Sequence, residues 1–124
     1  MLKNKRPYTN ENGHVDAGFI TDHPAEEREI VAEWIAAMIR PAKSRNRHRT
    51  SYGIKHILQG DTGIYLTNNE FKDAMLQAGY EPCDQNELNW TYKISNTSNA
   101  FNITTWRKRN QYPRGDGSFW RAIS

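Results

Sequence analysis

The spacing of hydrophobic residues predicts a first helix over residues 22–40. Apolar side chains recur there at intervals of three and four and therefore share one helix face, which is formed by Ile30, Val31, Trp34, Ile35 and Met38. Thr21 or Asp22 is suited to cap the start of this helix. Arg40 precedes Pro41, and a residue before proline avoids helical backbone angles, so the helix is expected to end there.

A second, shorter helix is predicted over residues 51–59. Ser51 is a suitable N-cap, and Gly60 is suited to end the helix. In this register Ile54 points toward a core and Lys55 points toward solvent.

A third helix, over residues 67–78, has the most complete start and stop signals. Thr67 and Glu70 have the spacing of a capping box, in which each side chain accepts a hydrogen bond from the backbone N–H of the other residue. Gly79 is suited to end the helix. The buried face is predicted to consist of Phe71, Ala74, Met75 and Ala78.

After Gly79 the pattern changes from helical spacing to alternation. Leu88, Trp90, Tyr92 and Ile94 alternate with polar residues, which predicts a half-buried strand, and a second strand is predicted from Phe101 to Trp106. Three helices followed by a small antiparallel sheet is the element order of a winged helix. We therefore expect a winged-helix-like α+β fold.

The chain of 124 residues is long enough for one core. Residues 1–20 show no periodicity and are expected to be a flexible N-terminal segment. Residues 21–106 are expected to form the single α+β domain, followed by a basic and aromatic tail over residues 107–124.

The formal charge of +3 is unevenly distributed along the chain. Two basic clusters stand out, one between the first two helices and one in the tail: Lys43, Arg45, Arg47, His48 and Arg49, then Arg107, Lys108, Arg109 and Arg114. Such clusters neutralise phosphates, so they predict binding of nucleic acid. Aromatic residues between the charges of the tail would suit single-stranded nucleic acid or RNA. A solvated surface without a ligand is the alternative interpretation.

In a winged helix, residues 67–78 would form the recognition helix. The side chains expected opposite its core face include Asn68, Asn69 and Lys72, which could contact base edges in a major groove. Because Glu70 and Asp73 make the helix slightly acidic, we expect neighbouring basic segments to supply most of the affinity.

No catalytic or metal-binding pattern is visible. The four histidines are scattered and Cys83 is the only cysteine, so we predict no metal site, no cofactor and no enzymatic activity. Tyr52, Lys55 and His56 could form an acid–base group on the second helix, although surface packing explains them equally well. Without an apolar N-terminal run, the protein is expected in the cytoplasm of a bacterial host, away from membranes.

Three segments resemble a group of small proteins carried by bacterial phages and integrative mobile elements. They are residues 49–56, residues 62–80 and Asn89-Trp90, with TSYGIKH and TNNEFKDAMLQAGY at their centre. The resemblance implies a small accessory protein that either binds nucleic acid or inhibits host defence, as anti-CRISPR proteins do.

The alternative to nucleic-acid binding is therefore inhibition of a host defence nuclease, such as a CRISPR effector, by protein–protein binding. Glu26, Glu29 and Glu33 on the outer face of the first helix could imitate the spacing of phosphates. A solvated helix exterior explains the same residues.

Overall fold

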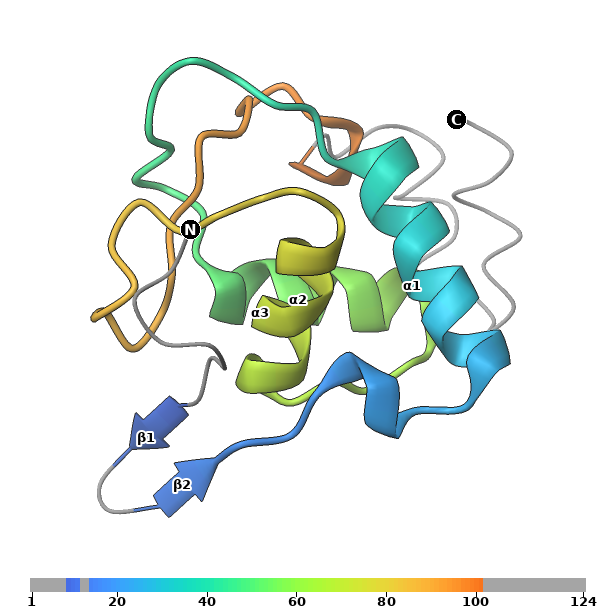
Figure 1. The fold of residues 1–124 in the computed structure, drawn as a ribbon. Helices are drawn as coiled ribbons and strands as arrows, with labels where there is room; N and C mark the ends of the chain where they lie inside the picture. The colour runs from blue at the N-terminus through green and yellow to red at the C-terminus, as the bar shows by residue number, and fades with distance from the viewer. Residues whose placement is uncertain (1–8, 12–13, 102–124) are drawn as a thin grey trace.

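The computed structural model describes residues 9–11 and 14–101. The described residues form three helices and one small antiparallel sheet (Figure 1). In chain order the elements are β1 (Thr9–Glu11), β2 (His14–Asp16), a 3₁₀ turn (Ile20–Asp22), α1 (Ala25–Met38), α2 (Ser51–Thr62), α3 (Asn68–Gln77) and a second 3₁₀ turn (Asn99–Phe101). Within the described residues, no helix is both long enough and apolar enough to span a bilayer.

The three predicted helices are confirmed, with shifted ends. Helix α1 starts after Pro24, because Asp22 instead caps the preceding turn by accepting a hydrogen bond from the Phe19 N–H at 2.9 Å. The N-cap of α2 is Thr50 and not Ser51. Helix α2 also continues past Gly60 to Gly63, whose φ of 78° is the left-handed conformation that glycine adopts readily.

The capping box of α3 is also confirmed. The Glu70 N–H donates to Thr67 Oγ1 at 3.2 Å, and the Thr67 N–H donates to Glu70 Oε1 at 2.9 Å. Both bonds satisfy backbone donors that the first turn of a helix leaves without intrahelical partners.

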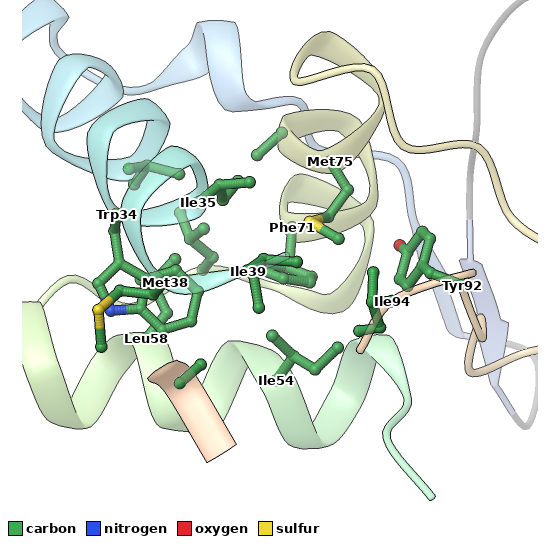
Figure 2. Packing of buried hydrophobic residues seen from close by; sticks show 14 of the residues in the cluster. Trp34, Ile35, Met38, Ile39, Ile54, Leu58, Phe71, Met75, Tyr92 and Ile94 are labelled. Carbon is green, nitrogen blue, oxygen red and sulfur yellow. The ribbon is translucent and has the colours of Figure 1, made fainter. Parts of the chain in front are cut away.

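The core lies where the three helices meet an extended segment, residues 90–95 (Figure 2). Trp34 of α1, Ile54 of α2, Phe71 of α3 and Tyr92 of the extended segment are all fully buried. The indole N–H of Trp34 donates to Asp61 Oδ2 at 2.9 Å, which ties α1 to the last turn of α2.

The prediction of a sheet after the helices is wrong for the described residues. Residues 88–94 form only two isolated bridges with the α1–α2 connection, Pro41 with Ile94 and Thr50 with Thr91. Alternate side chains of an extended segment still point into the core, which explains the strand-like pattern. Phe101 ends a 3₁₀ turn, and residues 102–106 lie outside the described part of the chain. A winged-helix arrangement is therefore absent from that part.

The sheet of the structure lies instead within residues 1–20, for which we expected no ordered structure. Thr9 pairs with Asp16, and Asn10 pairs with Val15. Each strand is three residues long, too short to produce a recognisable alternation. This β1–β2 hairpin and the chain after it are held against α3 by polar contacts from Thr9, Asp16 and Gly18.

These contacts overturn the prediction that Asn69 and Lys72 face solvent opposite the core. Asn69 is 0% exposed: its backbone N–H donates to Asp16 Oδ2 at 3.0 Å, and its side-chain amide donates to the Gly18 carbonyl at 2.7 Å. Lys72 is 1% exposed, with Nζ 2.9 Å from Thr9 Oγ1 and 4.8 Å from the Trp90 ring centroid. The sequence pattern of α3 alone could not reveal this cover.

Burial lowers the pKa of Lys72 to about 8, although the negative charge of Asp16 opposes this effect. The unfolded chain then binds more protons than the folded chain between pH 8 and 10.5, the ordinary pKa of lysine.

His23 connects the start of α1 to the start of α3. Its Nδ1 lies 2.8 Å from Glu27 Oε1, and its Nε2 lies 3.0 Å from Glu70 Oε1. Burial lowers the pKa of His23, but the hydrogen bonds and charges of the two carboxylates outweigh it, so the pKa is raised above 6.5.

The Lys72 pKa predicts that the free energy of unfolding rises between pH 8 and 9.5, by at most about 1.4 kcal/mol per pH unit. Denaturant titrations at a series of pH values measure this slope. The slope should be reduced in Lys72→Met, where the lowered pKa of Lys55 leaves a remainder, and kept in full in Lys93→Met, which changes an exposed lysine. An undiminished slope in Lys72→Met would contradict the assignment.

The raised His23 pKa predicts the opposite trend at lower pH. The stabilisation is complete below pH 6.5 and is lost as the pH rises through the pKa of the folded state. Denaturant titrations between pH 6 and 7.5 should show falling stability in the parent protein and in His48→Gln, which changes an exposed histidine. The same fall in His23→Gln would rule out His23 as its source.

Candidate nucleic-acid interface

The first predicted basic cluster lies in the basic loop, defined as residues 40–50 between α1 and α2. In Figure 1 this teal-to-green loop runs beside the orange extended segment. Backbone hydrogen bonds join the two: the N–H of Ala42 donates to the Lys93 carbonyl and that of Asn46 to the Tyr92 carbonyl, both at 2.9 Å. The N–H of Ser95 donates in the other direction, to the Arg40 carbonyl at 2.7 Å.

Asn46 fixes the middle of the basic loop from inside. Its buried side-chain amide donates to the Ile94 carbonyl at 3.3 Å, and its Oδ1 accepts from the His48 N–H at 2.9 Å. The loop therefore has a defined path although it contains no helix or strand.

Lys43, Arg47 and His48 are exposed along this path. Two further exposed cations come from the same pairing of segments: Arg40 at the start of the loop and Lys93 on the extended segment. The sequence pattern places Arg40 at a helix end and Lys93 on a strand, so neither was predicted to belong to the basic cluster.

Arg45 and Arg49 are less available than predicted. Arg45 Nε donates to Thr91 Oγ1 at 2.7 Å, and its Nη2 pairs with Glu87 Oε1 at 2.7 Å. The Arg49 guanidinium lies 4.6 Å over the Phe101 ring, and its buried Nε has no hydrogen-bond partner among the described residues. The five basic side chains predicted in this cluster are thus divided: three face solvent and two contact the protein.

Positive charge predominates around the basic loop, although the exposed Glu81 lines a surface pocket together with Pro41 and Lys93. No Asp or Glu occurs between Glu33 and Asp61, whereas six Lys or Arg residues do. Asp61 is buried against Trp34, and Glu87 pairs with Arg45. A surface of this kind attracts anions.

The predicted site residues at the start of α3 make contacts within the protein. Asn68 Oδ1 accepts from Ser51 Oγ at 2.8 Å, and its amide donates to Asn89 Oδ1 at 3.0 Å and to the Leu88 carbonyl at 3.3 Å. With Asn69 and Lys72 enclosed by the β1–β2 hairpin, none of the three is free to contact base edges in the structure described.

The second predicted cluster, which consists of Arg107, Lys108, Arg109 and Arg114, lies outside the described residues. Cys83 is exposed, and the described residues contain no group of three or more His, Cys, Asp or Glu side chains that could hold a metal ion. Lys55, which the sequence placed on the outside of its helix, is buried.

Comparisons with protein-family models, with curated proteins and with solved structures find no match to this chain.

Proposed function

We propose that this protein binds nucleic acid, either DNA or RNA, through the exposed side of the basic loop. The observation that carries the proposal is a fixed backbone from which Lys43, Arg47 and His48 extend into solvent, in a stretch of sequence without carboxylates. Held in this way, Lys43 and Arg47 can neutralise phosphates without first ordering the loop, so less conformational entropy is lost on binding.

Affinity in this proposal comes from charge and not from base reading by α3. Asn69 and Lys72 are enclosed, and Asn68 is bonded to Ser51 and Asn89, so these side chains do not contact base edges in a major groove. Phosphate contacts alone position a nucleic acid without selecting its sequence. Mobile-element origin, inferred from the sequence resemblance, agrees with a small accessory protein of this type.

The test is fluorescence anisotropy with labelled duplex DNA, single-stranded DNA and RNA over a series of salt concentrations. The parent protein should bind at low salt, with affinity falling as salt increases. Replacing Lys43 and Arg47 by glutamine should reduce the slope of log affinity against log salt by about 1.5, because two phosphate contacts are lost.

Arg28→Gln is the matched control, since Arg28 is an exposed cation on α1. This variant should bind as the parent does. The proposal fails if the parent protein binds none of the three nucleic acids at low salt, or if the double variant binds like the parent.

A second candidate function is inhibition of a host defence nuclease by protein–protein binding, as anti-CRISPR proteins do. The observation that favours it is the exposure of Glu26, Glu29 and Glu33 on α1. Their spacing places them on one side of the helix, where they could occupy a basic groove that normally holds nucleic acid.

This candidate predicts that the protein recovers a host nuclease from lysate even after nucleic acid is digested, and that it inhibits cleavage by that enzyme. Glu26→Gln combined with Glu29→Gln should weaken both effects, whereas Glu81→Gln, which changes an exposed carboxylate outside α1, should not. Recovery that disappears on digestion would instead indicate bridging by nucleic acid.

A further inference from the structure

Two tyrosines stand on the solvent side of α2 and of the connection to α3. Tyr52 is 50% exposed and Tyr65 is 57% exposed, which is high for large aromatic side chains in a folded domain. Between them lies Lys55, which is only 5% exposed. Its Nζ is 5.1 Å from the centroid of each tyrosine ring, so the two centroids are no farther apart than twice that distance.

This arrangement restrains the two rings before any ligand arrives. An ammonium group near the face of an aromatic ring is attracted by the ring quadrupole, and a single lysine here contacts both rings. His56 adds an edge contact to Tyr52, with ring centroids 4.6 Å apart and planes inclined by 78°. The tyrosine–lysine cluster, defined as Tyr52, Lys55, His56 and Tyr65, therefore presents aromatic surface with little ordering cost.

The cluster follows the basic loop directly. Tyr52 is the second residue of α2 and comes four residues after His48, so the two Cα atoms are at most about 14 Å apart. A flexible strand whose phosphates contact the loop can therefore reach the tyrosines. The charge nearby also suits it, because α2 carries no carboxylate before the buried Asp61.

We propose that Tyr52 and Tyr65, held by Lys55, are a stacking platform for the bases of an unpaired nucleic-acid strand bound along the basic loop. The inference rests on the proposed function and specifies its ligand as single-stranded. Bases of an unpaired strand expose their faces and stack on aromatic side chains, whereas bases inside a duplex do not. The negative charge of Asp16 is balanced by two neighbouring ammonium groups, because it acts on both Lys55 and Lys72.

The experiment compares binding of a 12-nucleotide oligothymidine and a 12-base-pair duplex by fluorescence anisotropy. Tyr52→Leu combined with Tyr65→Leu keeps apolar bulk beside Lys55 but removes the stacking surface. We expect at least a tenfold loss of affinity for oligothymidine, no change for the duplex and an unchanged salt slope. The double variant Tyr52→Phe and Tyr65→Phe, which keeps both aromatic rings, should bind oligothymidine within about twofold of the parent affinity. Circular dichroism melts should show that both double variants fold.

Photocrosslinking gives an independent readout, because a strand containing 5-iodouracil should form adducts at Tyr52 or Tyr65 in the parent protein. Equal oligothymidine affinity of the parent and the leucine variant would overturn the platform while leaving the proposed function intact. Absence of any nucleic-acid binding by the parent would overturn both. A further outcome is a protein partner that is captured after nucleic acid has been digested and whose capture requires both tyrosines. If the leucine variant then binds oligothymidine as the parent does, the surface binds a protein and the platform is overturned.

Discussion

The burial of Trp90, Tyr92 and Ile94 is the constraint on which the rest of the structure depends. These side chains complete the core under all three helices, but they belong to a segment that forms no regular sheet. Its buried backbone groups still need hydrogen-bond partners. The α1–α2 connection and Ser51 at the start of α2 supply most of them, so the packing of one segment determines the path of the other.

This coupling gives the positive charges different roles. Where the basic loop faces the extended segment, its arginines contact the protein: Arg45 bonds Thr91 and Glu87, and Arg49 covers Phe101. Where the loop faces away, Lys43 and Arg47 remain in solvent. In an alternating series of cations, every second side chain can therefore stabilise the loop, while the side chains between them stay available to a ligand.

The helices could be predicted from the sequence because their signals are local. Thr67 and Glu70 are three residues apart, and their reciprocal bonds are present as expected. The errors arise where distant segments meet. Lys72 looks like a surface residue until Thr9, 63 positions away in sequence, covers it, and the alternation around Tyr92 looks like a strand although only isolated bridges form.

The candidate site shows the same division. A dense run of cations identifies the basic loop without any structure, but the sequence does not distinguish Arg47 from Arg45, because that difference depends on Glu87 and Thr91. Lys55 was expected in solvent from helical periodicity. In the structure its Nζ instead contacts the rings of Tyr52 and Tyr65. The contact with Tyr65, which lies outside α2, could not be predicted from the periodicity of the helix.

Ser51 joins the segments that meet at this site. Its hydroxyl accepts the Trp90 N–H at 3.0 Å and donates to Asn68, while its own N–H donates to the Trp90 carbonyl. These bonds join residues that are far apart in the sequence: Trp90 is 39 positions from Ser51, and Asn68 is 17 positions from it. The backbone hydrogen bonds of a helix, in contrast, join residues only four positions apart. Loss of the packing around Trp90 would therefore release the basic loop together with the extended segment, so these two segments are coupled in any opening of the native state.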